Sequence, residues 1–128
     1  MAAGKGTRMK SRHSKVLQKL AGRALLEHVL DTAGQLQARS AVVITGHEAA
    51  QVEAAVAASA AGSAMTLQCV RQEPQLGTGH AVRAAASLLA DFDGHVVVTY
   101  GDVPLLKAAD IAPVFNGDHQ GVSVIGFE

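Results

Sequence analysis

The sequence predicts an α/β fold: a doubly wound, mostly parallel sheet with helices on both faces. Apolar runs rich in β-branched residues, the pattern of strands buried on both faces, alternate along the chain with segments of helical periodicity. This alternation is typical of right-handed βαβ crossovers, which build parallel sheets. Such sheets bind ligands at the carboxyl ends of their strands. We therefore expect function to lie in the loops that follow the strands.

Four strands and four helices are expected. The strands are short apolar runs, and they lie at 41–45, 65–70, 95–100 and 121–127. Among them HVVVTY, at 95–100, has the clearest pattern of a buried strand. The helices show a one-sided apolar face or an alanine-rich composition, and they are expected at 24–36, 48–60, 80–92 and 107–114. A chain of 128 residues is expected to form one domain.

The composition argues against several classes of protein. Hydrophobic residues make up 48% of the chain and charged residues 17%, which favours a soluble globular protein over a disordered one. Aromatic residues make up only 3%, which argues against a surface that stacks the bases of single-stranded nucleic acid. No apolar run approaches the ~20 residues of a transmembrane helix, and the N-terminus lacks the apolar core of a signal peptide. The single cysteine, Cys69, cannot form an internal disulfide and is expected to pack as a small apolar residue, so the expected compartment is the cytoplasm.

The charges balance in number but not in position. The chain has eleven basic and eleven acidic residues, and seven of the basic ones precede the first acid, Glu27: Lys5, Arg8, Lys10, Arg12, Lys15, Lys19 and Arg23. This asymmetry indicates an anionic partner near the N-terminus. A disordered basic arm on nucleic acid would give the same count, but the glycines and apolar residues between the charges favour a folded loop.

The opening stretch, MAAGKGTRMK, has the composition of a phosphate-binding loop. Gly4 and Gly6 allow backbone amides to approach a ligand, and Arg8 and Lys15 can hold phosphate oxygens. The spacing departs from the common templates, because Met9 stands where a dinucleotide fingerprint has glycine and no Walker A pattern is present. Taken alone, the stretch fits a phosphate loop and an ordinary turn equally well.

A second glycine-rich loop, QLGTGHA at 75–81, precedes an expected helix. Backbone amides of Gly77, Thr78 and Gly79 would face a ligand at the helix N-terminus, which favours negative charge. Gln72 carries a donor and an acceptor, as the edge of a nucleobase requires. His80 is expected to support the loop by hydrogen bonding. The alternative is a glycine-rich helix cap without a ligand.

The third loop follows the expected strand at 95–100 in VVVTYGDVPLL. A carboxylate at the carboxyl end of a central strand, here Asp102, is placed to hold Mg²⁺ against substrate phosphates. An aspartate at a strand end can instead cap the following turn. Gly101, directly before Asp102, favours the close approach of a ligand.

Three segments together carry a resemblance to a known family. AAGKGTRMKS…KVLQKLAGRALLEHVL, LGTGHA and YGDVPLL resemble the uridylyltransferase domain of the bifunctional N-acetylglucosamine-1-phosphate uridyltransferase/glucosamine-1-phosphate acetyltransferase family. The similarity runs nearly end to end, with the motifs in the family's order. It implies a Rossmann-like sheet of the nucleotide-diphospho-sugar transferase type. Residues 1–128 would be the N-terminal part of that domain.

The resemblance implies attack of N-acetylglucosamine 1-phosphate on the α-phosphate of UTP, with release of pyrophosphate and Mg²⁺ as cofactor. Arg8 and Lys15 would be the catalytic cations on the phosphates, and Asp102 would bind Mg²⁺. The nucleotide would be lined by Ala2, Ala3 and Gly4, with Lys15 at its phosphates, Gln72 reading the uracil edge beside Gly77 and Thr78, and Tyr100, Gly101 and Asp102 beneath ribose and sugar. No nucleic acid or membrane partner is implied.

The sequence also departs from the family. Ser14 stands where members usually have proline, and Gln18 where they usually have histidine. The family's first strand should precede Ala2, so the sheet is expected to lack it, and the parts that grip the sugar and supply a second metal ligand should follow Glu128. No hexapeptide period appears in residues 1–128, so they are not expected to include the repeat acetyltransferase domain through which full-length members of the family oligomerise. Because the first strand should be central, marginal stability is expected.

Two other functions remain open at this point. The first is a non-catalytic fragment that binds UTP or UDP. The second is the nucleic-acid-binding basic arm described above, which is the least favoured.

Overall fold

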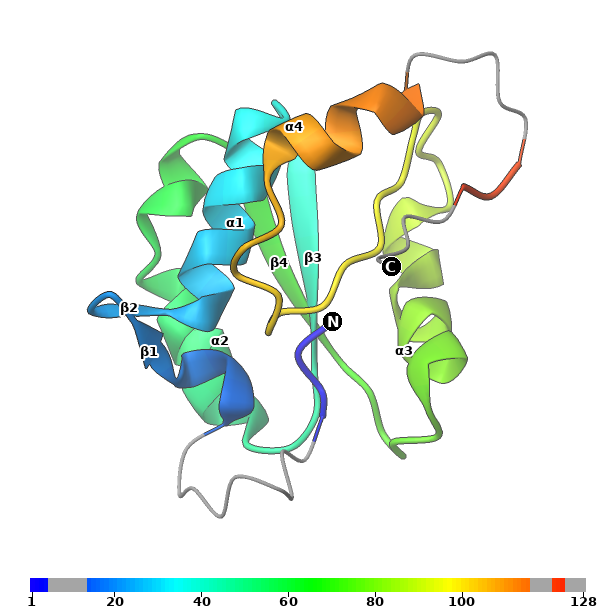
Figure 1. Cartoon of the computed structure of the whole chain (residues 1–128). Helices are drawn as coiled ribbons and strands as arrows, with labels where there is room; N and C mark the ends of the chain where they lie inside the picture. Colours follow the sequence, from blue (N-terminus) through cyan, green and yellow to red (C-terminus); the bar gives the residue numbers. More distant parts are fainter. Residues whose placement is uncertain (5–13, 116–120, 124–128) are drawn as a thin grey trace.

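The computed structural model describes residues 1–4, 14–115 and 121–123, and Figure 1 shows how their helices and strands are arranged. Strands β3 (Ser40–Thr45) and β4 (Thr66–Arg71) pair in parallel, with Ser40 opposite Thr66 and Thr45 opposite Arg71. A short antiparallel hairpin of β1 (Lys19–Leu20) and β2 (Arg23–Ala24) precedes them. The strands expected at 41–45 and 65–70 are thus confirmed.

The four expected helices are also present. They are α1 (Leu25–Gln35), α2 (Ala49–Ala57), α3 (Thr78–Ala85), which continues as the 3₁₀ turn η4 (Ala86–Leu89), and α4 (Ala108–Ile111), which continues as η5 (Ala112–Phe115). Two more 3₁₀ turns are η2 (Lys15–Leu17) and η3 (Ala60–Ser63). Within the described parts of the chain, no helix is long and apolar enough to span a bilayer.

The core forms on both faces of β3, because side chains alternate across a strand. Val43 packs with Leu30 of α1 and Val52 of α2 on one face. Ile44 packs with Ala81 and Ala85 of α3 on the other face. Figure 1 shows the same layers, with α1 and α2 on one side of β3 and β4 and α3 on the other. This is the doubly wound arrangement that the sequence predicts.

The first residues of the chain occupy the next position in the sheet after β3. The Ala2 N–H donates to the Ile44 carbonyl at 2.8 Å. On the other side, the Met1 amino group donates to the Thr99 carbonyl at 2.6 Å, and the Gly101 N–H donates to the Met1 carbonyl at 2.8 Å. Met1 thus bonds to Thr99 through its amino group and to Gly101 through its carbonyl. Bonds from one residue to two residues that lie two positions apart on the neighbouring segment are the pattern of a parallel bridge. The parallel order is therefore β4, β3, residues 1–3, and residues 99–101.

The strand predicted at 95–100 does not form, and that prediction was wrong. Val96, Val97 and Val98 are 53%, 43% and 53% exposed instead of buried. A buried strand needs a hydrogen-bonded neighbour, and no described residue pairs with 95–98. The apolar pattern of this segment did not reveal that residues 95–98 have no neighbouring strand among the described residues.

The expectations for Cys69 and for a strand at 121–127 are compared with the structure next. Cys69 is exposed on β4, where an interior apolar position was expected; β4 is the outer segment of the parallel order, with β3 as its neighbour on one side. Of the strand expected at 121–127, residues 121–123 form no strand, and 124–127 lie outside the described residues.

We predict that Val52→Ala destabilises the chain by about 2 kcal/mol, because it removes two methyl groups from a closely packed site. Val52 is fully buried in the cluster formed by α1, α2 and β3. Val122→Ala is the control, since Val122 is 94% exposed, and it should change stability by less than about 0.5 kcal/mol. Urea unfolding followed by circular dichroism measures both. Equal effects would contradict this description of the core.

Candidate functional site

The candidate site lies at the carboxyl edge of the sheet, where the parallel segments end. Gly4 follows residues 1–3, Gly46 follows β3, Gln72 follows β4, and Asp102 follows 99–101. The Gln72 N–H donates to the Thr45 carbonyl at 2.8 Å, and the His47 N–H lies 3.5 Å from the Ala3 carbonyl, so the ends of neighbouring segments are joined. Figure 1 shows the N-terminal stretch beside β3 at this edge.

An ion pair between Lys15 and Asp102 closes the edge on one side. Lys15 begins η2, and its Nζ contacts Asp102 Oδ2 across 87 residues of sequence. Both side chains are partly accessible, at 43% exposed for Lys15 and 25% for Asp102. The fold thus brings the predicted phosphate-binding cation and the predicted metal-binding carboxylate together. Ser14, which precedes Lys15, is buried, and its hydroxyl has no hydrogen-bond partner among the described residues.

The amino group of Met1 lies close to this pair. Burial lowers its pKa below the ordinary value of 8.0, and the nearby charge of Asp102 opposes part of that shift. Its bond to the Thr99 carbonyl holds it inside the sheet, one segment away from Asp102.

Gln72 is buried and supports the second loop from beneath. Its side-chain nitrogen donates to the Gly77 carbonyl at 2.8 Å and contacts His80 Nδ1 at 3.2 Å. The hydrogen-bonding role expected of His80 is thus present. The amide nitrogen of Gln72 is therefore already hydrogen-bonded within the protein. That Gln72 binds the edge of a uracil base stays a prediction.

The loop held by Gln72 presents the N-terminus of α3. Gly77 has φ +99°, in the region that favours glycine, and is the residue before the helix. Gly77 and Thr78 are both exposed, so the first amides of α3 are open to an anion.

Gly101 has a packing reason to be glycine. A Cβ at this position would lie 3.0 Å from Val16 Cγ1 and 3.3 Å from the Met1 carbonyl oxygen. Its small size lets η2 and the N-terminal stretch approach each other, whereas the sequence indicated the approach of a ligand. Tyr100 beside it is half exposed.

Gly46 is a site residue that the sequence reasoning missed. A Cβ there would lie 3.0 Å from Ala3 Cβ, 3.1 Å from the Ala3 carbonyl oxygen and 2.5 Å from Gln75 Nε2. The position therefore requires glycine if Ala3 is to lie against the end of β3. A glycine directly after the apolar run at 41–45 was the available signal.

The sequence analysis also did not predict an ion pair that fixes the end of β4 to α2. Arg71 makes a two-pronged contact with Glu53 of α2, with Nε and Nη2 each 2.7 Å from a carboxylate oxygen. Hydrogen bonding from Arg71 lowers the pKa of Glu53 below its usual range. The hydroxyl of the fully buried Thr45 also donates to Glu53, at 3.2 Å. The ends of β3 and β4 are thereby tied to α2.

The remaining predicted residues are placed as follows. Ala2 and Ala3 are buried in the sheet and Gly4 is exposed beside them, while Arg8 lies outside the described residues. Among the residues the structure describes, no group of three or more histidine, cysteine, aspartate or glutamate side chains could hold a metal. A single accessible carboxylate, Asp102, suits Mg²⁺, which is commonly held by one or two carboxylates together with substrate phosphates and water.

The fold is of the nucleotide-diphospho-sugar transferase type. The structure is similar to the UDP-glucose pyrophosphorylase from Acinetobacter baumanii, with a TM-score of 0.57 and 21% identity over 69% of this chain and 39% of that one. Residues 1–126 match the MobA-like NTP transferase domain. The chain therefore belongs to this family.

Its curated relatives include the bifunctional protein GlmU of several bacteria. The chain is 65% identical over 112 residues to the protein from Albidiferax ferrireducens, covering 87% of this chain and 24% of that one. It is 44% identical over 132 residues to the protein from Sphingopyxis alaskensis, covering 100% of this chain and 28% of the relative. The chain thus spans about a quarter of the length of these relatives, and the family resemblance read from its motifs is confirmed.

We predict that Gly46→Ala destabilises the chain by about 1–3 kcal/mol, because the new methyl group meets the backbone of Ala3. Gly79→Ala is the matched control, since nothing lies within 4 Å of a Cβ there and alanine favours helix α3. It should leave stability unchanged or slightly raised. Urea unfolding measures both variants, and a stable Gly46→Ala chain would show that Ala3 does not depend on this contact.

Burial of the Met1 amino group predicts a pH dependence of stability. Because its pKa is lowered in the folded chain, the unfolded chain binds more protons. The free energy of unfolding should therefore rise as pH increases from the lowered folded pKa through 8.0. N-terminal acetylation keeps an N–H for Thr99 but removes the titrating charge, so this part of the rise should disappear. Thermal melts of both forms, with Met1 verified by mass spectrometry, test this; parallel pH profiles would contradict it.

Proposed function

We propose that this chain forms the UTP-binding part of an enzyme that transfers a uridylyl group from UTP to N-acetylglucosamine 1-phosphate. The products would be UDP-N-acetylglucosamine and pyrophosphate. The observation that supports this best is the Lys15–Asp102 ion pair at the carboxyl edge. It joins a phosphate-binding cation to a carboxylate suited to Mg²⁺, in a chain 65% identical to bifunctional GlmU proteins over most of its length.

The reaction needs positioning and charge compensation more than covalent chemistry from the protein. A phosphate oxygen of the sugar phosphate attacks the α-phosphorus of UTP, and the bond from that phosphorus to the β-phosphate oxygen breaks as pyrophosphate leaves. Bound Mg²⁺ would neutralise charge on the phosphate oxygens. The chain itself supplies the groups that hold the triphosphate and orient it.

Each group has a task in this proposal. The triphosphate carries more negative charge than Asp102, so it draws the Lys15 ammonium onto its own oxygens. Asp102 is then left available to Mg²⁺. The exposed amides of Gly77 and Thr78 at the start of α3 accept a negative group or a carbonyl edge. Arg8 would add a second cation to the phosphates, and Ala2, Ala3 and Gly4 would line the nucleotide, with Tyr100 and Gly101 beneath the sugars.

We also propose that residues 1–128 are the N-terminal part of the catalytic domain, acting in the cytoplasm without a membrane or nucleic-acid partner. The relatives are about four times as long as the matched segment, which favours a binding-only chain as the second candidate. In that case the chain binds UTP or UDP, and turnover requires further segments. Oligomerisation of the relatives would then also depend on parts beyond the match.

We predict that Lys15→Gln weakens UTP binding about tenfold, because it removes a charge-assisted hydrogen bond to phosphate. Asp102→Asn should bind UTP without Mg²⁺ as well as the parent does, but lose the gain in affinity that Mg²⁺ provides. Lys107→Gln is the control, since Lys107 is an exposed lysine at the start of α4, and it should bind normally. Isothermal titration with and without Mg²⁺ measures all three.

Turnover separates the two candidates. The chain is mixed with UTP, N-acetylglucosamine 1-phosphate and Mg²⁺, and pyrophosphate release is followed by a coupled assay. Release that Asp102→Asn abolishes supports the enzyme. UTP binding without release supports the binding-only chain. Absence of UTP binding in a chain that circular dichroism shows to be folded refutes both.

A further inference from the structure

The buried side chain of Gln72 contacts two hydrogen-bond acceptors. Gln72 is the first residue after β4, and its backbone N–H donates to the Thr45 carbonyl at 2.8 Å, which joins its main chain to the end of β3. Its side-chain Nε2 donates to the Gly77 carbonyl at 2.8 Å and lies 3.2 Å from Nδ1 of His80. Gln72 is only 3% exposed, so both contacts are made where water has little access.

The Gly77 carbonyl identifies which branch of the Gln72 amide is the nitrogen. A carbonyl oxygen accepts and cannot donate, so an amide oxygen at 2.8 Å would place two acceptors in contact. The atom that faces Gly77 is therefore Nε2, which has two N–H groups and no acceptor. Its second N–H bonds to Nδ1 of His80, and Nδ1 accepts only when it carries no proton. The ring proton of neutral His80 is then on Nε2 of the imidazole.

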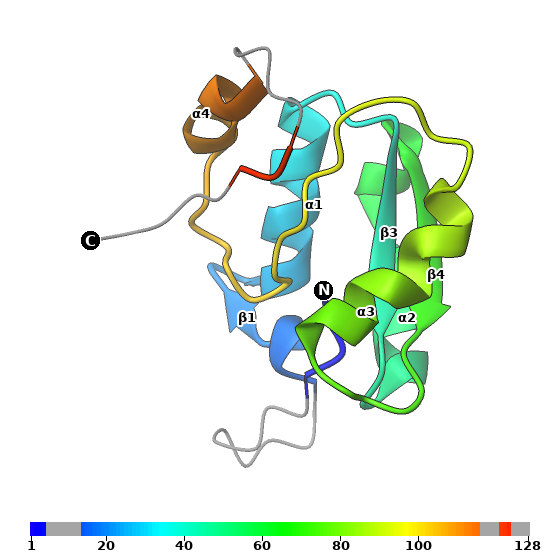
Figure 2. The same cartoon turned by 90° about the vertical axis from the view of Figure 1, so that its right-hand side faces the viewer.

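The two acceptors belong to different parts of the fold. Gly77 lies in the loop before α3, whereas His80 is the third residue of α3, which begins at Thr78. Figure 2 shows α3 in front of β3 and β4, and α3 packs on the sheet through Ala81 and Ala85. The contact with His80 therefore ties the orientation of the Gln72 side chain to a helix that is fixed on the sheet.

Two bonds from one nitrogen fix the direction of the amide oxygen. A single bond to Gly77 would leave the planar amide free to turn about that bond, and the second bond, to His80, sets its plane. Both N–H groups of the Gln72 side chain are then used within the protein, and Oε1 is the group that it can offer a ligand. Glutamine by type can donate or accept, but Gln72 held in this way is an acceptor.

An acceptor beside donors distinguishes two bases of the same size. The backbone amides of Gly77 and Thr78, both exposed residues next to Gln72, are donors. Uracil has an N–H at N3 between two carbonyl oxygens, whereas cytosine has an unprotonated N3 beside an amino group. The uracil edge therefore matches this arrangement. Cytosine would place acceptor against acceptor and donor against donor, which leaves polar groups unpaired.

We propose that His80 is a positioning residue for base selection. Through Nδ1 it holds the second N–H of Gln72, so that Gln72 presents only its oxygen and favours uridine over cytidine nucleotides. This inference rests on the proposed function and on the predicted contact of Gln72 with the base of UTP. His80 itself does not touch the base, and it acts through the orientation of Gln72.

Matched variants of His80 separate positioning from a merely structural role. His80→Leu removes the acceptor, whereas His80→Asn keeps one, because Oδ1 of asparagine lies near the position of Nδ1. Isothermal titration of the whole chain measures the affinities for UTP and CTP in the presence of Mg²⁺. His80→Leu should lower the ratio of UTP to CTP affinity about tenfold, because the freed Gln72 amide can turn, and His80→Asn should restore the ratio. Arg83→Leu, at an exposed residue further along α3, is the control and should leave the ratio unchanged.

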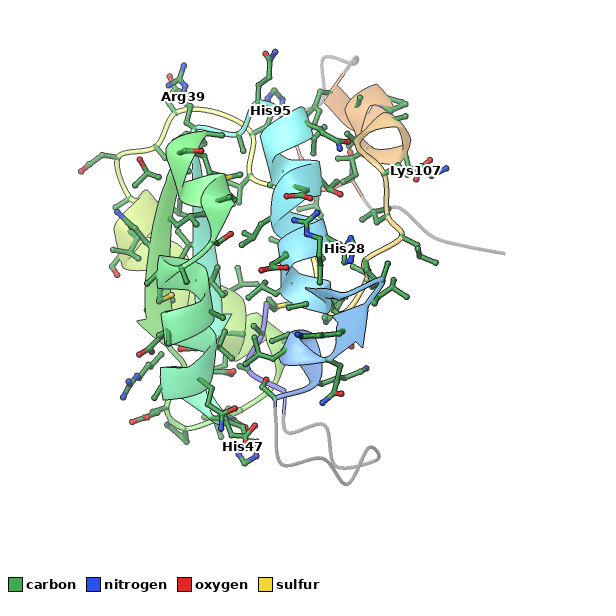
Figure 3. All side chains as sticks on the ribbon, turned by 90° about the vertical axis from the view of Figure 1, so that its left-hand side faces the viewer. His28, Arg39, His47, His95 and Lys107 are labelled. Atoms are coloured by element: carbon green, nitrogen blue, oxygen red, sulfur yellow. The ribbon has the colours of Figure 1, made fainter. Side chains whose placement is uncertain are left out.

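The imidazole nitrogens provide a measurement that needs no nucleotide. At slightly alkaline pH, long-range ¹⁵N–¹H NMR spectra should show His80 with an unprotonated Nδ1 and a protonated Nε2. His80→Asn identifies these signals by their loss. The signals of His28 and His95 should remain, because these rings contact the Leu20 carbonyl and the Phe115 ring, and Figure 3 shows them apart from each other. A proton on Nδ1 of His80 would overturn the proposal, since Nδ1 could not then accept from Gln72.

The outcomes distinguish this proposal from the proposed function. UTP binding with the same ratio of UTP to CTP affinity in the parent and all variants overturns the role of His80 and leaves the proposed function intact. A parent chain that is folded by circular dichroism and binds neither nucleotide overturns both. If His80→Leu does not fold, His80→Gln replaces it, because the longer side chain places its amide near the position of Nε2 and leaves no acceptor at that of Nδ1.

Discussion

The structure depends on a few backbone hydrogen bonds made by its first two residues. Ala2 bonds to β3 and Met1 bonds to Thr99 and Gly101, so a single extended backbone joins the two halves of the chain. Without these bonds, residues 99–101 would have no described sheet neighbour. The position of Asp102 beside Lys15 follows from the bond to Gly101, and Gly101 must be glycine because Met1 and Val16 lie against it.

The candidate site combines a rigid frame with a few adjustable charges. The buried Gln72 side chain holds the second loop, Gly46 lets Ala3 lie against the end of β3, and Arg71 ties β4 to α2 through Glu53. Lys15 and Asp102, by contrast, are partly exposed and bonded to each other. An ion pair at an accessible site has a small net energy, so a ligand with greater charge can replace it at low cost. That division would suit the triphosphate binding and product release that we propose.

Local patterns predicted the elements whose neighbours are present. The strands at 41–45 and 65–70 pair with each other, and the helix expected at 24–36 has Leu26 and Leu30 on its buried face. HVVVTY at 95–100 has the strongest strand pattern of all and forms none. A strand is stabilised by its partner's hydrogen bonds as well as by its own side chains, and the pattern carries no information about the partner. Gly46 was missed for a related reason, because its close contact is with Ala3, far away in sequence.

The sequence by itself determined the α/β class, the four helices, the two paired strands β3 and β4, and the three loops in which we predict the site residues. These follow from periodicity and from residue types within a few positions of each other. Only the tertiary structure decided that Lys15 meets Asp102 and that Gln72 holds Gly77. The physical reason is that these contacts depend on strand order. Strand order is set by hydrogen bonds between segments that are up to 98 residues apart, and no local pattern records it.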